Sequence, residues 1–333
     1  MLFLVWAIMP ARKHHSKEKI MQHTNRFNHR TWSILALVVI AVLALAAACS
    51  GSGAEQAAAP EPTAVPPTAV PPTEAPATAE IPVVTIEATD SGLNVPEVVP
   101  GGIVRIDVTN SGSAPAAVGL LRIKEGHTRQ ELNEFKAVAD ANPEAFFGLF
   151  ELANMIHSVQ DVAPGTTSSF HVDLRTGDFI LSDDTNPAND LTFFAANEIV
   201  GTTEPEAAVT VDMVDFAYAM PDTVPGQGLW EFVNSGDQWH LAALTTYNPD
   251  VTPEQLLGLF SEEGGPPPAD APVQVMGGLP PMSPGERVWV EMDLQPGQYQ
   301  LVCPLPDLTA MVAGEEPMPH LLHGMMHMFT VEN

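Results

Sequence analysis

The 333-residue chain is strongly acidic, with 41 Asp and Glu residues against 13 Lys and Arg residues. Six of the basic residues and one of the acids precede Cys49, so the remainder carries seven bases, 40 acids and a formal charge of −33. Such a surface repels nucleic acid and anionic lipid headgroups, which excludes nucleic-acid binding, and it suits a basic partner protein. Without its leader and linker the chain still has about 250 residues, enough for two ordinary domains.

Residues 1–48 have the composition of an export leader. An apolar run from Ile34 to Ala48 follows two arginines and ends at Cys49, before Ser-Gly-Ser-Gly. The run is short for a membrane-spanning helix but long enough for the apolar part of a signal peptide. The segment resembles a bacterial lipoprotein signal, which implies lipidation of Cys49 and a lipid anchor on the extracytoplasmic face of the cell membrane. The alternative is an uncleaved anchor helix. Met21 begins a conventional signal, so we expect translation to start there.

Residues 49–80 predict an extended spacer. After the cysteine the segment consists mainly of Ala, Pro, Thr and Glu, and the sequence Pro-Thr-Ala-Val-Pro at 62–66 returns at 67–71. This composition cannot bury a core and favours a polyproline-like conformation. We therefore expect the linker to hold the following domains away from the membrane.

The two parts of the remaining chain, 81–200 and 206–333, share short motifs at nearly the same spacing, which indicates an internal repeat. Each part therefore predicts one domain. The shared motifs are Val-Thr-Ile-Glu (84–87) and Val-Thr-Val-Asp (209–212), Asn-Ser-Gly (110–112 and 234–236), and Pro-Gly pairs (100–101 and 225–226, 164–165 and 284–285).

Short alternating runs of apolar residues, such as 229–233 and 288–292, predict β-strands in both parts. Pro-Gly or Asn-Ser-Gly turns bound these runs, a pattern typical of the half-buried strands of a sandwich. Each part also has one capping-box helix start, at Thr128 and at Thr252, and Pro253 stands at the first helical position. We expect a mostly β fold of two tandem Greek-key sandwiches, each with a helical insertion.

The second part carries a set of potential metal ligands. His240 begins a strand after the Asn-Ser-Gly turn, and Cys303 follows the strand 298–302. His320 and Met325 lie in the segment His-Leu-Leu-His-Gly-Met, just before the last strand. A thiol in an exported protein is prone to oxidation unless it is buried or metal-bound. The order of these residues resembles that of the blue-copper, plastocyanin-like cupredoxins.

The resemblance implies a cupredoxin-like domain with one copper ion held by His240, Cys303 and His320, and with Met325 as a weak axial ligand. One thiolate, two imidazoles and a thioether suit both Cu(I) and Cu(II), which allows electron transfer. Sixteen residues separate Cys303 from His320, so the intervening loop must fold back. The possible substitutes for these ligands in the same segment are His323, Met326 and Met328.

The first part keeps the pattern without the ligands. Aligning the two Asn-Ser-Gly turns places Ala116 opposite His240, and aligning Gly177 with Gly297 places Asp183 opposite Cys303. We therefore predict a degenerate cupredoxin-like domain that serves in spacing, docking or dimer contact. Its unmatched histidines are predicted to be surface or packing residues; they are His127, His157 and His171.

The sequence thus predicts a membrane-tethered, extracytoplasmic copper protein that transfers single electrons, with a basic redox protein as partner. It is not expected to be an enzyme, because no Ser-His-Asp or paired-carboxylate arrangement has the necessary local context. Two alternatives stay open. The methionine-rich segment before the last strand favours a copper(I) chaperone or storage protein. In a metal-free interaction module, Cys303 would contribute to packing only.

Overall fold

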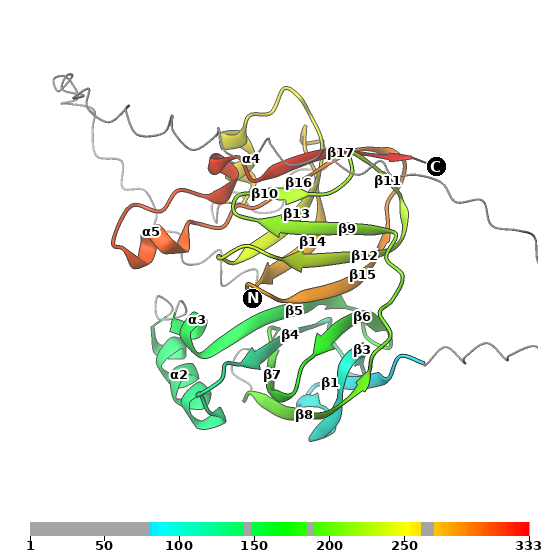
Figure 1. Ribbon diagram of the computed structural model, residues 1–333, viewed down its shortest axis with the longest axis vertical. Coiled ribbons are helices and arrows are strands. Elements are labelled where there is room, and N and C mark those ends of the chain that lie inside the picture. Colours follow the sequence, from blue (N-terminus) through cyan, green and yellow to red (C-terminus); the bar gives the residue numbers. More distant parts are fainter. Residues whose placement is uncertain (1–79, 143–147, 186–189, 261–269, 333) are drawn as a thin grey trace, which may run out of the picture. The chain divides into compact units, whose positions relative to one another are not determined.

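A computed structural model of the chain describes residues 80–142, 148–185, 190–260 and 270–332 (Figure 1). The predicted leader, Cys49 and nearly all of the linker lie outside these ranges. The described chain is mostly β and forms two sandwiches with helical insertions, which confirms the predicted fold class. Within these ranges no helix has both the length and the apolar character needed to cross a membrane.

The described residues of the first sandwich form eight strands and two helices. In chain order these are β1 (Val83–Thr89), β2 (Gly92–Asn94), β3 (Val98–Asn110), β4 (Ala116–Ile123), α2 (Arg129–Ala141), α3 (Leu149–Leu152), β5 (Ala153–Val162), β6 (Thr167–Leu174), β7 (Gly177–Asp183) and β8 (Thr192–Gly201).

The second sandwich follows, and the part of it that the structure describes has nine strands, two α-helices and a 3₁₀ helix. These are β9 (Val209–Val214), β10 (Ala217–Ala219), β11 (Thr223–Pro225), β12 (Gln227–Asn234), β13 (His240–Thr246), α4 (Pro253–Leu259), β14 (Val275–Met282), β15 (Arg287–Asp293), β16 (Gly297–Val302), α5 (Leu308–Val312), η2 (His320–His323) and β17 (Met326–Glu332).

The two sandwiches pair their strands in the same way. In one layer, β1 is parallel to β3 and β3 is antiparallel to β6; in the second sandwich, β9, β12 and β15 repeat these pairings. The other layer has the order β8-β7-β4-β5 in the first sandwich and β17-β16-β13-β14 in the second. Strand β3 joins the two layers of the first sandwich, because it pairs with both β8 and β6. In the second sandwich two separate strands make the equivalent pairings: β11 pairs with β17, and β12 pairs with β15. This is the expected Greek-key arrangement.

Alternating burial along the strands builds the cores. In β1, Val84, Ile86 and Ala88 are buried between more exposed neighbours, and in β12, Trp230 and Phe232 are buried in the same way. Because successive side chains of a strand point to opposite faces, every second residue enters the space between the layers. The sequence periodicity that predicted strands therefore also fixes which side chains form the core.

The two predicted capping boxes begin helices. Thr128 caps α2 by accepting from the backbone N–H of Glu131, while the Glu131 side chain accepts from the backbone N–H of Thr128. Thr252 and Gln255 make the same exchange at α4, where Pro253 is the first helical residue. These reciprocal bonds satisfy backbone donors that have no partner within a helix.

A buried asparagine closes each Asn-Ser-Gly turn. The Asn234 side-chain amide donates to the carbonyls of Gln238 (2.9 Å) and Met282 (2.7 Å), and its oxygen accepts from the Gly236 N–H (3.0 Å). Asn110 makes the same three kinds of bond in the first sandwich. The turn at Asn234 delivers the chain to β13, whose first residue is His240.

The two sandwiches share an extended sheet, because β6 pairs with β15. Beside this seam, the backbone of Met155 donates to the Ser283 hydroxyl (2.8 Å) and accepts from the Ser283 N–H (2.9 Å). The ring of Phe150 packs edge-on against Trp239, with centroids 3.7 Å apart. The first sandwich therefore contacts the residue that precedes His240.

Candidate metal centre

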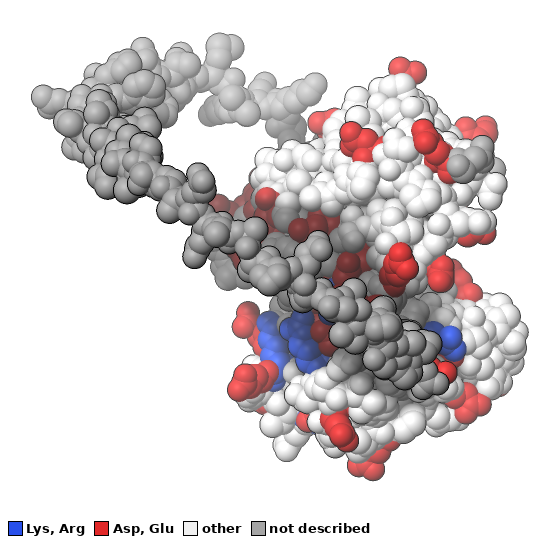
Figure 2. Space-filling view, turned by 45° about the vertical axis from the view of Figure 1, so that its right-hand side comes forward, with Lys and Arg blue, Asp and Glu red and all other residues white. Residues whose placement is uncertain are grey.

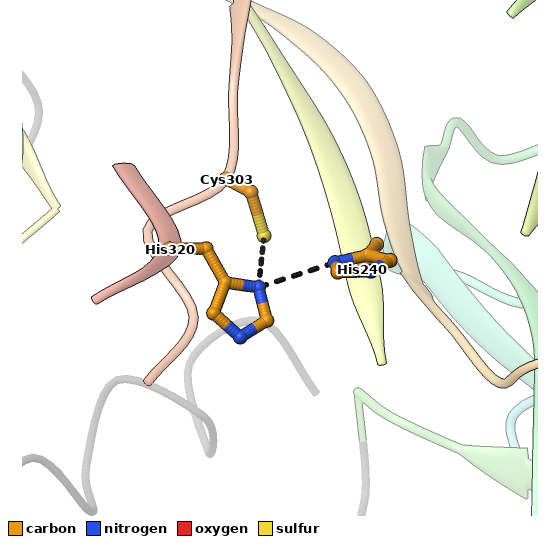
Figure 3. Close-up of side chains that lie close together, drawn as sticks. All are labelled: His240, Cys303 and His320. Atoms are coloured by element: carbon orange, nitrogen blue, oxygen red, sulfur yellow. Dashed lines mark hydrogen bonds between the residues drawn. The ribbon is translucent and has the colours of Figure 1, made fainter. Parts of the chain in front are cut away.

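Three predicted ligands meet at one end of the second sandwich (Figure 3). His240 is the first residue of β13, Cys303 follows β16, and His320 is the first residue of η2. The Nδ1 atoms of the two imidazoles lie 3.1 Å apart, and Cys303 Sγ lies 3.4 Å from His320 Nδ1. One ligand atom from each residue lies within 4.8 Å of the others, and all three residues are buried.

The long loop between Cys303 and His320 closes through backbone hydrogen bonds. Cys303 O accepts from Leu321 N–H (2.7 Å), and Leu305 O accepts from His320 N–H (2.8 Å). Farther out, Pro306 and Pro319 form an isolated antiparallel bridge, and helix α5 lies within the loop. The sixteen intervening residues thus form a hairpin that returns His320 to the thiol.

A side chain from the Asn-Ser-Gly region ties this hairpin to the strand that carries His240. Gln238 Oε1 accepts from the backbone N–H of Leu308 at 2.8 Å, at the start of α5. The Asn234 side chain in turn holds the carbonyl of Gln238. The two separate ligand-bearing segments are therefore connected by hydrogen bonds as well as by packing.

An aspartate and a phenylalanine, neither of them predicted as site residues, also contact the cluster. Asp215 Oδ1 lies 2.6 Å from His240 Nε2, and the ring centroid of Phe216 lies 4.7 Å from that of His320. Both residues follow β9. The sequence did contain a signal for the carboxylate, since Asp90 follows β1 at the equivalent place in the first part.

Burial favours the neutral forms of the three candidate ligands. Desolvation raises the pKa of the Cys303 thiol to about 12, opposed by backbone hydrogen bonds from Leu241 and Leu305. Desolvation also lowers the pKa of His320 to about 3, with a further contribution from His240. It lowers the pKa of His240 too, against the attraction of Asp215. Two neutral imidazoles are suitable metal ligands, and a bound cation would favour the thiolate.

The donor set and its spacing fit a soft metal ion. With metal–nitrogen bonds of about 2.0–2.1 Å and metal–sulfur bonds of about 2.3 Å, three ligand atoms around one ion lie roughly 3.5–4 Å apart. The 3.1 and 3.4 Å separations found here need only a small opening of the cluster. One thiolate with two imidazoles is the donor combination that proteins use for copper in electron transfer.

Met325 is fully buried and connects two ligands through its backbone. Its N–H donates to His320 O (2.9 Å), and its carbonyl accepts from the Cys303 N–H (3.2 Å). Its role as axial ligand stays a prediction.

The three predicted substitutes lie in more exposed positions than Met325. The His323 side chain is 31% exposed and stacks on Phe216, with centroids 4.5 Å apart. Met326 is partly buried, and Met328 is 51% exposed. His323 does not belong to the cluster of His240, Cys303 and His320.

The first sandwich has no such cluster among its described residues. Ala116 begins β4 as His240 begins β13, and Asp183 ends β7 where Cys303 follows β16. Of the unmatched histidines, His157 is buried against Phe170, with ring centroids 4.5 Å apart. Burial lowers the pKa of His157 to about 3. His127 lies 3.7 Å from the Glu131 carboxylate, and His171 is half-buried in β6.

Comparisons with known proteins found no matching family model, and no curated protein matches. Among solved structures, an auracyanin from the photosynthetic bacterium Roseiflexus castenholzii has 23% identity, covers 38% of this chain and all of its own, and has a TM-score of 0.27. Auracyanin B has 20% identity, 40% and 94% coverage and a TM-score of 0.24. A copper-containing nitrite reductase from Thermus scotoductus has 11% identity, 75% and 61% coverage and a TM-score of 0.22. Because these identities and TM-scores are low, the assignment of the metal site rests on the geometry of the site itself.

Proposed function

We propose that the second sandwich binds one copper ion through His240, Cys303 and His320, with Met325 as the axial ligand, and transfers single electrons. The observation that carries this proposal is the convergence of a buried thiol and two buried imidazole nitrogens within 4.8 Å of one another. Copper bound there would supply the one-electron Cu(I)/Cu(II) couple. The chain holds its ligands on strand ends and on a hydrogen-bonded hairpin, which limits their rearrangement between the two oxidation states.

A chain of aromatic contacts offers a route from the site to solvent. His320 is fully buried, whereas His323 is partly exposed. Phe216 lies between them, with ring centroids 4.7 Å from His320 and 4.5 Å from His323. These contacts favour electron exchange near His323, because a partner cannot touch the His320 ring directly.

The surface charge and the leader support further parts of this proposal. Figure 2 shows acidic side chains scattered over the displayed face, with few basic ones. A redox partner with a basic surface would be attracted to this charge. The lipoprotein-like segment ending at Cys49 favours an exported protein anchored by lipid to the extracytoplasmic face of the membrane. In this setting the protein would carry electrons without making or breaking substrate bonds.

The alternative of copper(I) delivery or storage has one structural feature in its favour, the half-exposed Met328 thioether in the last strand. Repeated reduction with ascorbate and reoxidation with ferricyanide, followed by desalting, separates the two functions. We expect an electron carrier to keep its copper and its visible absorption through all cycles. Loss of copper on each reduction, or ready transfer to an apo-oxidase, would instead identify a copper donor.

A further inference from the structure

Asp215 contacts the candidate centre without being a ligand. We propose that its carboxylate is a positioning residue, which holds the His240 ring so that the bare Nδ1 faces Cys303 and His320. This inference rests on the proposed copper function, but it also makes a claim about the metal-free protein. A ligand histidine commonly donates its second ring N–H to a carboxylate, which fixes both the tautomer and the ring orientation.

The carboxylate uses both of its oxygens as acceptors. Oδ1 lies 2.6 Å from His240 Nε2, and Oδ2 accepts from the backbone N–H of Asp237 at 3.0 Å. The nitrogen facing Oδ1 must therefore carry the imidazole proton, which leaves the lone pair on Nδ1. The His240 side chain is fully buried, while the Asp215 side chain is 28% exposed. Asp215 thus bonds the ring from the side opposite to the thiol.

Comparison with the equivalent aspartate of the first sandwich distinguishes the positioning role of Asp215 from a purely structural role. Asp90 follows β1 as Asp215 follows β9, and its Oδ1 accepts from the N–H (2.7 Å) and the hydroxyl (2.9 Å) of Ser113. Both aspartates therefore fasten the Asn-Ser-Gly turn. Only Asp215 also holds an imidazole, because Ala116 stands at the position equivalent to His240.

The glycine of the turn leaves space for the Asp215–His240 contact. A Cβ atom on Gly236 would lie 2.3 Å from Asp215 Oδ1 and 2.7 Å from His240 Nε2. A Cβ atom on Gly112 would meet the Asp90 and Asn110 oxygens at 3.0 and 3.1 Å. A methyl group at 236 would thus enter the hydrogen bond itself, so Gly236→Ala should weaken copper binding without altering a ligand.

The matched pair Asp215→Asn and Asp90→Asn tests the proposal. The two donors face different oxygens of Asp215, and an asparagine replaces one of these oxygens with an NH2 donor, so it cannot accept from both His240 and Asp237 in this geometry. An asparagine at 90 can still use one oxygen for Ser113. Competition with a chelator should show Cu(II) affinity about 10- to 100-fold weaker for Asp215→Asn. Asp90→Asn should stay within about twofold of the unsubstituted protein. The thermal unfolding midpoint of the apo protein should fall less for Asp90→Asn, which keeps its bonds to Ser113, than for Asp215→Asn.

A second measurement does not need copper. Nitrogen-15 NMR of the imidazoles in the apo protein should show His240 with its proton on Nε2, and Asp215→Asn should shift the population toward Nδ1–H. An unchanged tautomer and unchanged affinity in Asp215→Asn would overturn the proposal, as would an equal loss of affinity in Asp90→Asn. If the unsubstituted protein bound no copper, the proposed function would fail, and the tautomer comparison would still decide the role of Asp215.

Discussion

Replacing Cys303 with serine should abolish the intense thiolate-to-Cu(II) absorption toward the red end of the visible spectrum. Cys303 supplies the thiol of the cluster, and its Sγ lies 3.4 Å from His320 Nδ1. A serine hydroxyl is a harder donor that does not form a thiolate bond, so Cu(II) affinity should also fall by a factor on the order of 100 or more. Absorption spectra during Cu(II) titration of both proteins measure the two effects.

The natural control is Cys49→Ser, which replaces the other cysteine of the chain and should keep the absorption band. If the protein binds no metal, Cys303→Ser should change only packing and stability. Neither the unsubstituted protein nor the variant should then show the absorption band. A band that survived in Cys303→Ser would place the chromophore elsewhere and would contradict the proposed ligand set.

Breaking the buried ion pair between the sandwiches should cost about 3–5 kcal/mol of unfolding free energy. Arg122 Nη2 bonds Glu286 Oε2, and Asn154 donates to Glu286 Oε1 at 3.1 Å. The two charged side chains are only 11% and 2% exposed. Burial raises the pKa of Glu286 and lowers that of Arg122, in each case against the attraction of the partner. Arg122→Met therefore leaves a desolvated carboxylate without its counter-charge, and urea unfolding measures the loss.

Two further variants make this expectation specific. The double variant Arg122→Met with Glu286→Leu removes both charges and should recover most of the loss, because a buried pair replaced by apolar side chains is often neutral or better. The exposed pair of Arg105 and Asp107 is the surface control, and Arg105→Ala should cost at most about 1 kcal/mol. A loss from Arg122→Met no larger than that from Arg105→Ala would show that the ion pair does not stabilise the seam.

Local sequence features predicted the architecture because they act through local physics. Alternating apolar residues predicted the strands. Thr128 and Thr252 predicted where the helices begin, because their capping bonds span only three residues. Aligning the two Asn-Ser-Gly turns placed Ala116 opposite His240, and the structure puts both residues at the start of equivalent strands. The candidate ligands could be named because their order along the chain matches the order of strand ends.

Contacts between distant segments were not predictable in this way. The pairing of β6 with β15 joins the two sandwiches, yet the sequence of each strand alone predicts only an ordinary half-buried strand. The return of His320 to Cys303 depends on a proline-rich loop whose hydrogen bonds have no periodic signature. The repeat marks Asp215 as the counterpart of Asp90, but an acid after a strand usually faces solvent, and only the fold places Asp215 against His240.

The central claim is that one sulfur and two imidazole nitrogens from separate segments bind the same ion. X-ray absorption at the copper edge of the loaded protein measures this directly. We predict one short copper–sulfur distance and two copper–nitrogen distances, with imidazole scattering that disappears in part when His240 or His320 is replaced. A copper environment of nitrogen and oxygen alone, or a protein that retains no copper after desalting, would contradict the account.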